Sequence, residues 1–179
     1  MRIIGGMLKG RRFSPPANFR LRPTTDMAKE NLFNVLSNFI DFEDITALDL
    51  FSGTGSISYE LASRGCKNIT SVENNFYHYK FILKCIEELK LQNVIKPLKQ
   101  NVFLYIKKTE LLRFDLIFAD PPFEFPNLDE IPDIILNSNL LKENGYFILE
   151  HGPGHDFSKT SNFLQIRHYG KVCFSIFRV

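Results

Sequence analysis

The strongest constraint on the fold of this chain is an alternation of short apolar runs with helical patterns, which begins at residue 45. The predicted strands are Ile45–Leu50, Asn68–Val72, Val94–Leu98, Phe114–Ala119 and Tyr146–Glu150. The predicted helices between them are Ser56–Arg64, Tyr79–Leu89, Val102–Lys107 and Leu128–Asn137. Strands that alternate with helices indicate βαβ units with right-handed crossovers, which build a parallel sheet covered on both faces. We therefore predict an α/β fold.

Both ends of the chain depart from this alternation. The segments Leu164–His168 and Val172–Phe177 flank a turn at Gly170, which predicts a terminal antiparallel hairpin. Nearer the start, a helix is predicted to begin at Asp26, with Thr25 as its N-cap. Its buried face is predicted from apolar residues spaced by three and four positions, namely Ala28, Leu32, Val35, Leu36 and Phe39.

The length of 179 residues fits one domain. No stretch approaches 18 consecutive apolar residues, and residues 1–22 lack an apolar signal core, so neither a membrane span nor a secretory signal is expected. Three widely spaced cysteines fit a reduced cytoplasm better than a disulfide scaffold. We predict a cytoplasmic monomer with a basic hairpin extension over residues 1–22 and one domain over residues 23–179.

The net charge of +2 conceals an uneven distribution of charge. Residues 1–22 hold six basic side chains and no acidic one, whereas the rest of the chain holds 16 basic and 20 acidic side chains. The six are Arg2, Lys9, Arg11, Arg12, Arg20 and Arg22. Glycines and apolar residues such as Ile3 and Phe13 lie among them, which favours a short packed hairpin over a solvated tail. A basic extension on an acidic body predicts a polyanionic partner.

A glycine loop joins the first predicted strand to its helix, where residues 48–55 read Leu-Asp-Leu-Phe-Ser-Gly-Thr-Gly. Gly53 and Gly55 permit a tight turn and close approach of a ligand to the backbone. Parallel sheets bind ligands at the carboxyl ends of their strands, where this loop is predicted to lie. Glu73 ends the next strand, and an acid at that point can accept hydrogen bonds from ribose hydroxyls. The pattern predicts a nucleoside site.

The charges around the loop narrow the choice of nucleoside. No Gly-Lys-Ser/Thr sequence follows the glycines, so the loop is not a Walker A loop. Asp49, just ahead of the glycines, would repel the pyrophosphate of NAD, whereas it suits the ammonium and sulfonium of S-adenosylmethionine. The sequence favours this methyl donor, and a helix-capping loop without a ligand stays open as the alternative.

A second motif, Asp120-Pro121-Pro122-Phe123, directly follows a predicted strand. Two prolines cannot continue a central strand, so they predict a rigid loop at the edge of the sheet that carries the glycines. The Asp120 carboxylate and the Pro121 carbonyl can accept the two hydrogens of an exocyclic amine and localise its lone pair toward a methyl donor. Phe123 can stack on the base, a contact worth about 1–3 kcal/mol.

These two motifs resemble those of amino-methyltransferases that act on exocyclic amines of bases, and further motifs are similar to those of the RsmD family. The latter are Arg2-Ile3-Ile4-Gly5-Gly6, Lys9-Gly10-Arg11, Arg22-Pro23-Thr24-Thr25-Asp26, Leu32-Phe33-Asn34, Ser63-Arg64-Gly65 and Tyr169-Gly170. The resemblance covers nearly the whole chain. It implies the seven-stranded Rossmann-like class I methyltransferase sheet. It also implies 16S rRNA (guanine(966)-N(2))-methyltransferase activity, which methylates the N2 amine of one guanine in small-subunit rRNA.

The resemblance also implies roles for individual residues. The implied cofactor contacts are Asp49, Phe51, Gly53, Gly55, Glu73, Asn101 and Asp120. The implied catalytic residues are Asp120 and Pro121, which would hold the amine, and Phe123, which would stack on guanine. Thr24, Thr25 and Asp26 would border the cofactor or target pocket beside the basic extension. Met27 stands where the family often has arginine, and Asn101 stands where it often has aspartate.

Other patterns and other functions compete with this interpretation. His151 and His155 flank Gly152-Pro153-Gly154, which opposes a helix, so no metal site is predicted. The expected partner is small-subunit rRNA, either naked or in an assembling 30S particle. The Asp-Pro-Pro-Phe motif does not discriminate base identity, so an enzyme that methylates adenine N6 or another base stays open. A binding module that docks on RNA without catalysis is the alternative from another class.

Overall fold

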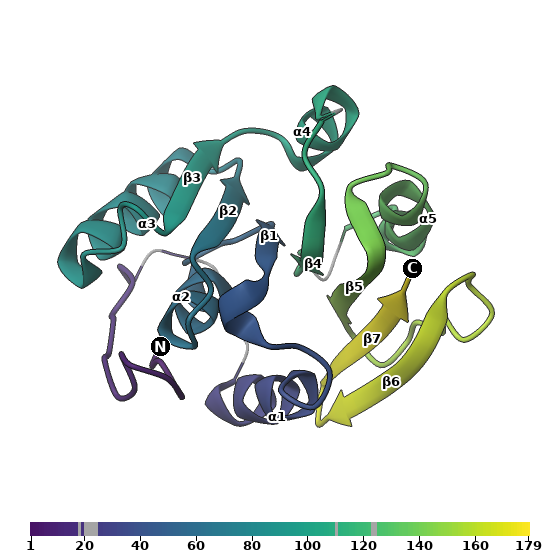
Figure 1. Ribbon diagram of the computed structural model, residues 1–179, viewed down its shortest axis with the longest axis horizontal. Coiled ribbons are helices and arrows are strands. Elements are labelled where there is room, and N and C mark those ends of the chain that lie inside the picture. The colour runs from purple at the N-terminus through teal and green to yellow at the C-terminus, as the bar shows by residue number, and fades with distance from the viewer. Residues whose placement is uncertain (18, 20–24, 110, 123–124) are drawn as a thin grey trace.

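The computed structural model describes residues 1–17, 19, 25–109, 111–122 and 125–179. Its centre is a seven-stranded sheet of order β3-β2-β1-β4-β5-β7-β6 (Figure 1). The strands are β1 Thr46–Leu50, β2 Asn68–Glu73, β3 Ile95–Lys99, β4 Phe114–Ala119, β5 Leu141–His151, β6 Phe163–Tyr169 and β7 Val172–Arg178. The predicted strand segments are thus confirmed, with β5 extended by five residues at its start.

The first five strands pair in parallel, and β7 pairs antiparallel with both β5 and β6. This arrangement confirms the predicted mostly parallel sheet with a C-terminal antiparallel hairpin. The order reverses between β1 and β4, because β1 leads outward to β2 and β3 while the chain returns to place β4 on the other side of β1. Such a reversal point is where open parallel sheets bind ligands.

In the part of the chain that the structure describes, five α-helices connect or flank the strands: α1 Asp26–Leu36, α2 Ser56–Ser63, α3 Phe76–Leu89, α4 Val102–Lys108 and α5 Ile131–Leu136. Short 3-10 turns precede β1 and α5 at Phe42–Asp44 and Leu128–Glu130. The Thr25 side chain caps α1 by accepting a hydrogen bond from the Ala28 amide, as predicted.

Two helical predictions were wrong in detail. Leu128–Asn137 is not one helix but a 3-10 turn followed by α5, and Pro132, which has no amide hydrogen to donate to a preceding turn, lies in the first turn of α5. Phe39 is not on the buried face of α1, because the helix ends at Leu36. Instead Phe39 is 43% exposed and its ring stacks on Tyr146.

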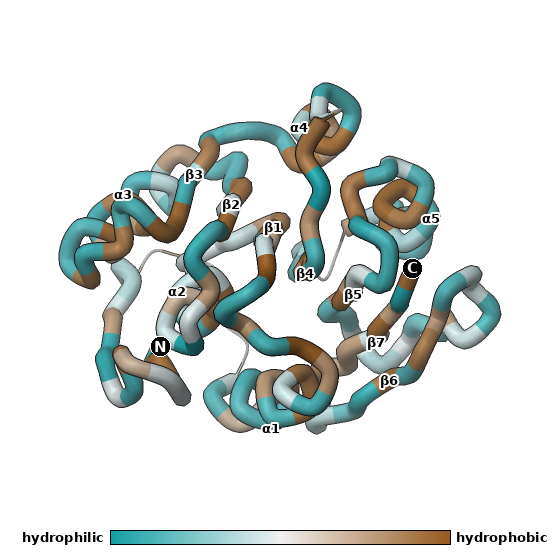
Figure 2. The backbone as a smooth tube through the Cα atoms, viewed as in Figure 1, coloured by the Kyte–Doolittle hydropathy of each residue, from teal (hydrophilic) through white to brown (hydrophobic). Residues whose placement is uncertain are grey.

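Two apolar clusters fill the space on opposite faces of the sheet. Successive residues of β1 alternate between them, since Ala47 belongs to the cluster under α1, α2 and α3, whereas Leu48 belongs to the cluster under α4 and α5. Figure 2 shows hydrophobic residues, in brown, concentrated in the strands and in parts of the helices. Among the described residues, no helix is both long enough and apolar enough to cross a membrane.

The N-terminal segment folds back on itself and lies beside α2, where Figure 1 draws it in purple. One isolated antiparallel bridge joins Arg2 to Arg12, and the Ile3 and Phe13 amides donate to the Arg11 and Met1 carbonyls, so this part turns back on itself as a short hairpin whose pairing is limited to one bridge. Gly6 and Gly10, which both adopt positive φ angles, lie in the turn between the two paired segments. We call residues 1–13 the basic loop.

Candidate functional site

The sheet register brings the predicted site residues to one edge. Leu50 of β1 lies opposite both Val72 of β2 and Ala119 of β4, and Ala119 lies opposite Leu149 of β5. The residues that come next on these four strands therefore follow one another along the carboxyl edge of the sheet. In the order of the strands they are Glu73, Phe51, Asp120 and Glu150. Three of the four are acidic.

The glycine loop closes on itself directly after β1. The Ser52 amide donates to the Val72 carbonyl, and the Gly55 amide donates to the Ser52 carbonyl. Gly53 and Gly55 have φ angles of 55° and 80°, and Phe51 shares this left-handed conformation at 57°. A non-glycine residue seldom adopts such an angle, and residues that do so often lie at functional sites. The turn places the start of α2 at the sheet edge.

Gly55→Ala is expected to destabilise the protein by about 2–4 kcal/mol, from the cost of a positive φ and of overpacking. The new Cβ would lie 2.5 Å from the Tyr59 hydroxyl, and Tyr59 is fully buried. Urea unfolding would measure this loss. Gly10→Ala is the matched control, since Gly10 also has a positive φ but a Cβ added there would have nothing within 4 Å. Equal losses in the two variants would contradict the packing argument.

Asp49 lies beneath the loop with 1% of its surface exposed. Its Oδ2 accepts hydrogen bonds from the amide of Ser58 at 3.1 Å and from the hydroxyl of Ser58 at 2.6 Å. Burial raises the pKa of Asp49 to about 7, against these hydrogen bonds, which favour the ionised form. A buried carboxyl that titrates near neutrality is typical of a functional site, and a nearby cation would favour its ionised form.

Glu73 binds the backbone on both sides of the loop. Its Oε2 accepts from the Gly53 amide and its Oε1 accepts from the Asn75 amide, each at 2.7 Å. The residue is 8% exposed. The sequence predicted an acceptor for ribose hydroxyls, and the structure adds that the same carboxylate fixes the glycine loop. Because a carboxylate has about four lone-pair sites, acceptor capacity remains after these two bonds.

Asp120 follows β4 next to the glycine loop, and its amide donates to the Leu50 carbonyl at 3.4 Å. Burial, the charge of Glu150 and the charge of Asp49 raise the pKa of the Asp120 carboxyl well above its usual range. Glu150 is itself 2% exposed. Pro121 is buried and Pro122 is exposed, whereas Phe123 lies outside the described residues.

An aromatic cluster beside this edge was not predicted from the sequence. Phe51 contacts Phe103 of α4 and Phe125 in edge-to-face geometry, with ring centroids 6.2 and 5.9 Å apart. The rings of Phe103 and Phe125 stack on each other at 5.6 Å. Only Phe51 was predicted as a site residue. The available signal was that Phe103 lies in the first turn of the helix after β3 and that Phe125 follows the Asp-Pro-Pro-Phe motif.

Asn101, predicted near the adenine, is the N-cap of α4. Its Oδ1 accepts from the amides of Phe103 and Leu104 at 3.0 and 3.1 Å. The residue is exposed at the end of the loop after β3. The structure therefore gives its side-chain oxygen a capping role and places the first turn of α4 next to the aromatic cluster.

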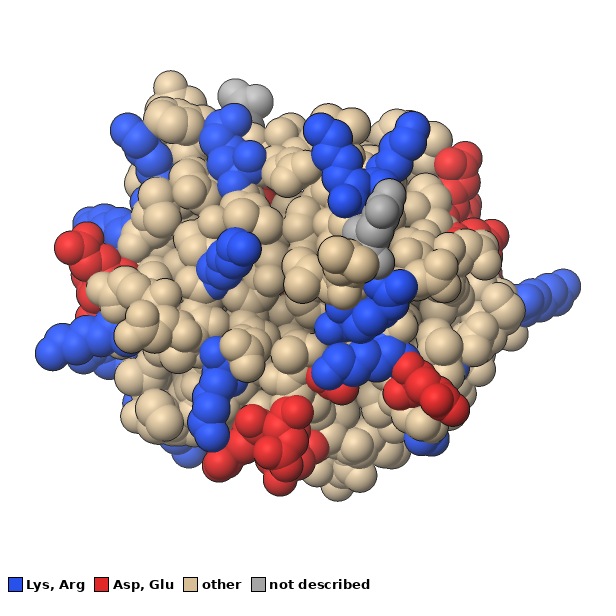
Figure 3. All heavy atoms as spheres, turned by 45° about the horizontal axis from the view of Figure 1, so that its top comes forward, with Lys and Arg blue, Asp and Glu red and all other residues tan. Residues whose placement is uncertain are grey.

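The predicted RNA contacts divide into three groups. Lys9, Arg11 and Arg12 are exposed on the basic loop. Arg2 and Asp26 form an ion pair at 3.2 Å, with each side chain more than two-fifths exposed. Arg20, Arg22 and Thr24 lie outside the described residues, and the Thr25 side chain caps α1. Figure 3 shows that basic side chains (blue) are spread over the face of the molecule that it presents, with acidic side chains (red) toward its margins.

His151 and His155, for which no metal site was predicted, each have a nearby polar side chain as partner. Nε2 of His151 lies 2.8 Å from the Ser175 hydroxyl, and burial lowers the pKa of this imidazole. Nδ1 of His155 lies 2.8 Å from Asp129. In the described ranges, no group of three or more His, Cys, Asp or Glu side chains is arranged to hold a metal ion.

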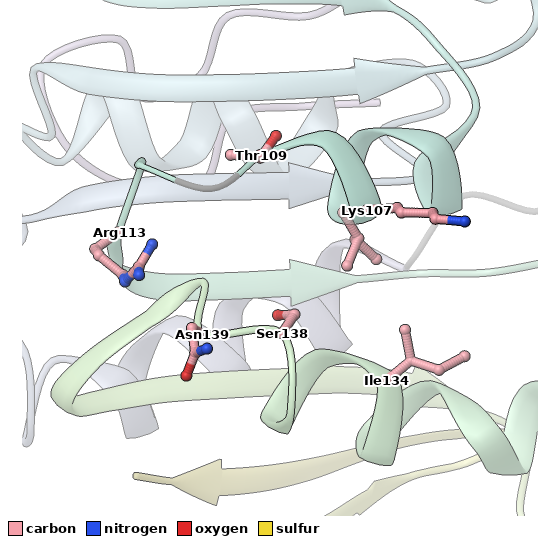
Figure 4. Close-up of a pocket in the computed structure, with 7 residues that line it drawn as sticks. Lys107, Thr109, Arg113, Ile134, Ser138 and Asn139 are labelled. Atoms are coloured by element: carbon pink, nitrogen blue, oxygen red, sulfur yellow. The ribbon is translucent and has the colours of Figure 1, made fainter.

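A pocket of about 370 Å³ lies away from this edge of the sheet (Figure 4). Lys107 and Thr109 line it from the end of α4, and Arg113, Ser138 and Asn139 line it from the segments that precede β4 and β5. Figure 4 shows Arg113 and Asn139 near the start of these strands, whereas Asp120 follows the end of β4. This pocket is therefore separate from the candidate site.

Comparisons with known proteins agree with the geometry. The family model described as Conserved hypothetical protein 95 matches residues 1–178. Ribosomal RNA small subunit methyltransferase D of Buchnera aphidicola subsp. Acyrthosiphon pisum is 33% identical over 148 residues, which cover 83% of this chain and 76% of the relative.

Two solved structures share the fold. The Thermus thermophilus hypothetical protein TTHA0928 superposes with a TM-score of 0.87 at 22% identity, over 100% of this chain and 99% of that one. The T. thermophilus 16S rRNA N2 G1207 methyltransferase (RsmC), solved with AdoMet and guanosine, has a TM-score of 0.69 at 23% identity, over 87% of this chain and 43% of that one.

The strand order, the glycine loop after β1 and the acids after β2 and β4 are those of the class I methyltransferase fold, and the 33% identical relative is a methyltransferase. The match to the family model and the identity to the curated relative specify the group more closely. The chain belongs to the RsmD family.

Proposed function

We propose that this protein transfers a methyl group from S-adenosylmethionine to the exocyclic N2 amine of a guanine in small-subunit rRNA. The observation that carries the proposal is the juxtaposition of Asp120-Pro121 with the glycine loop, because the Asp120 amide is bonded to the last residue of β1. The choice of guanine N2 comes from the resemblance of the N-terminal motifs to the RsmD family, and the rRNA substrate is the one that its curated relative's name states.

The residues at the sheet edge fit a cationic nucleoside cofactor. Burial raises the pKa of Asp120, and so do the charges of Glu150 and Asp49, because the acids repel one another when ionised. A sulfonium or ammonium beside these acids would offset that repulsion and be stabilised by their negative charge. Glu73 retains acceptor capacity for the ribose, and the Phe51 cluster supplies apolar surface for the adenine. The proposed cofactor residues are Asp49, Phe51, Gly53, Gly55, Glu73, Asn101 and Asp120. The cofactor supplies an electrophilic methyl group.

Asp120 and Pro121 are proposed to hold the target amine. The carboxylate of Asp120 and the carbonyl of Pro121 would accept its two hydrogens, which keeps the nitrogen lone pair out of the base and directs it at the methyl carbon. These acceptors also stabilise the positive charge that grows on nitrogen. Water or a phosphate then takes the released proton. Phe123, which lies outside the described residues, is proposed to stack on the base.

The ionisation of Asp120 gives a reason for an order of binding. Burial and the charges of Glu150 and Asp49 raise the pKa of this carboxyl, so a nearby cation would favour its ionised form. The ionised carboxylate accepts an amine hydrogen more strongly than the neutral acid does, and it alone carries full negative charge. A bound cationic cofactor would favour the ionised carboxylate that accepts the amine hydrogen, so we propose that the cofactor binds before the RNA.

We also propose which residues contact the RNA and in what form the protein acts. Lys9, Arg11 and Arg12 of the basic loop would contact rRNA phosphates, with Arg2, Arg20, Arg22, Thr24, Thr25 and Asp26 nearby in sequence. Residues 1–22 would then serve recognition, and residues 23–179 would serve catalysis. The protein would act in the cytoplasm as a monomer without a metal, on rRNA either naked or in an assembling 30S particle.

The proposal predicts N2-methylguanosine as the product. Purified protein is incubated with S-adenosylmethionine labelled in its methyl group and a transcript of small-subunit rRNA, and the labelled nucleosides are identified by mass spectrometry. Labelled N2-methylguanosine is expected, at the position that loses its methyl group in rRNA from a deletion strain. Labelled N6-methyladenosine would instead indicate the other base class. RNA binding without any labelled nucleoside on naked transcript or on 30S particles would indicate a non-catalytic module.

A further inference from the structure

The basic loop is closed by its own backbone. The Ile3 amide donates to the Arg11 carbonyl, the Gly10 amide donates to the Ile3 carbonyl, and the Phe13 amide donates to the Met1 carbonyl. Ile3 and Phe13 are buried, whereas Lys9, Arg11 and Arg12 are exposed. The three exposed cations therefore belong to one hydrogen-bonded loop. The direction in which they point depends on how this loop is attached to the rest of the domain.

Glu60 of α2 makes that attachment. Its Oε2 accepts from the Ile4 amide and its Oε1 accepts from the Gly5 amide, both at 2.8 Å. The side chain is completely buried, so its charge must be balanced by nearby donors. Arg64 donates to Oε1 at 2.9 Å, and Nζ of Lys29 lies 3.7 Å from Oε2.

Lys29 of α1 contacts both the basic loop and α2. It is 1% exposed, and its Nζ donates to the Arg2 carbonyl at 2.7 Å and to the Ser56 hydroxyl at 3.0 Å. Burial lowers the pKa of Lys29, opposed by the charge of Glu60. One buried ammonium thus joins the basic loop to the first residue of α2, directly after the glycine loop.

Ser63 holds the other half of the basic loop. Its hydroxyl donates to the Gly5 carbonyl at 2.5 Å and accepts from the Leu8 amide at 2.9 Å, while its carbonyl accepts from the Met7 amide at 2.7 Å. A Cβ on Gly6 would lie 1.8 Å from the Ser63 carbonyl oxygen. Only glycine permits this approach, so the loop is fitted to one turn of α2.

We propose that Glu60 is a positioning residue that orients the basic loop, so that Lys9, Arg11 and Arg12 face rRNA phosphates while α2 presents its other end to the cofactor. Helix α2 binds Asp49 through Ser58 and the basic loop through Glu60, so one short helix fixes both the cofactor site and the RNA contact. This inference rests on the proposed function, because it assumes that the partner of the basic loop is RNA.

The salt dependence of RNA affinity tests the positioning role. Each phosphate contact contributes about 0.7–0.9 to the slope of log affinity against log salt concentration, so neutralising three contacts lowers the slope by about 2 to 3. We expect this decrease in the triple variant K9A/R11A/R12A, measured with a transcript of small-subunit rRNA. Glu60→Gln keeps all three cations, and we expect it to lower the slope by a similar amount because it releases the loop.

Additional measurements separate positioning from a general loss of structure. Glu60→Gln should increase hydrogen exchange at the Ile4 and Gly5 amides by at least about tenfold, which corresponds to the loss of one charge-assisted hydrogen bond. Affinity for S-adenosylmethionine should stay near that of the wild type. Added to the triple variant, Glu60→Gln should cause no further loss of RNA affinity. Glu87→Gln, at an exposed position of α3, is the matched control and should change none of these quantities.

Ser63→Ala provides a second test if Glu60→Gln does not fold, since it removes only one hydroxyl of the same attachment, and a smaller decrease in slope is expected. A wild-type slope in Glu60→Gln or in a folded Ser63→Ala would overturn the positioning role and leave the proposed methyl transfer intact. A wild-type slope in the triple variant would overturn the RNA contact of the basic loop, and the inference with it. Absence of N2-methylguanosine from the wild-type reaction would instead contradict the proposed function.

Discussion

Asp120→Ala is expected to lower kcat for methyl transfer to guanine N2 by about 100- to 1,000-fold, the loss seen when one preorganised charge-stabilising group is removed from an active site. Alanine removes the carboxylate that would accept an amine hydrogen and stabilise the charge growing on nitrogen. It also removes one of three neighbouring acids, so the thermal stability should be equal to or higher than that of the wild type. Single-turnover kinetics with saturating RNA and cofactor would measure the chemical step.

The control for Asp120→Ala is Asp133→Ala, an exposed position on α5 in the segment that follows the same loop. This variant should keep the wild-type rate. Because Asp49 and Glu73 would still hold the cofactor, affinity for S-adenosylmethionine, measured by calorimetry, should fall far less than kcat in Asp120→Ala, which would assign most of the loss to the chemical step. Full methyl transfer by Asp120→Ala would refute the role proposed for the motif.

Asp49→Asn is expected to weaken binding of S-adenosylmethionine by about 10- to 100-fold at pH 8, since a charged hydrogen-bonding partner contributes about 1.5–3 kcal/mol. Wild-type affinity should fall as the pH decreases through about 7, because protonation removes the charge of Asp49. The affinity of the asparagine variant should lack this step. Calorimetric titrations between pH 6 and 8 would reveal the difference.

The same substitution should stabilise the protein without its cofactor. The pKa of Asp49 is about 7 in the folded chain against 3.8 for an unperturbed aspartate, so the folded state binds the proton more tightly. Its contribution to stability is therefore fully present below pH 3.8 and is lost as the pH rises through about 7. Asparagine does not ionise and so does not lose this stability. The free energy of unfolding of Asp49→Asn should therefore exceed that of the wild type by about 4 kcal/mol above pH 7, and the difference should decrease toward pH 4.

Urea unfolding at pH 4 and pH 8 would test the direction of this pH dependence. Asp44→Asn, at an exposed position just before β1, is the control and should show the same pH dependence as the wild type. A gain at pH 4 equal to that at pH 8 would show that the effect of Asp49→Asn comes from packing and not from its ionisation.

The parts of the fold that local sequence determines were predicted correctly. Strands β1 and β4 follow from unbroken apolar runs, and α2 follows from a glycine loop before it and Gly65 after it. The placement of Asp49, Glu73 and Asp120 near one edge of the sheet was predicted because each lies at or next to a strand end, and parallel strands end at one edge. The split at Pro132 and the end of α1 before Phe39 were missed, since capping and proline geometry outweighed the apolar spacing there.

The parts of the site that depend on distant segments were not predicted. Phe103 and Phe125 are far apart in sequence and meet at Phe51 only because α4 and the loop after β4 lie beside the same strand end. Glu60 and Lys29 occupy helical positions that a sequence would assign to solvent, yet both are buried because the basic loop covers them.

The sequence by itself determined the class of fold, the residues at the strand ends and the basic character of the first residues. Spacing of apolar side chains and turn chemistry act between near neighbours, so they can be read directly from the chain. Only the tertiary structure decided the order β3-β2-β1-β4-β5-β7-β6, the effect of Asp49 and Glu150 on the ionisation of Asp120, and the attachment of the basic loop to α2. These features arise from pairing, burial and charge between segments that no local pattern connects.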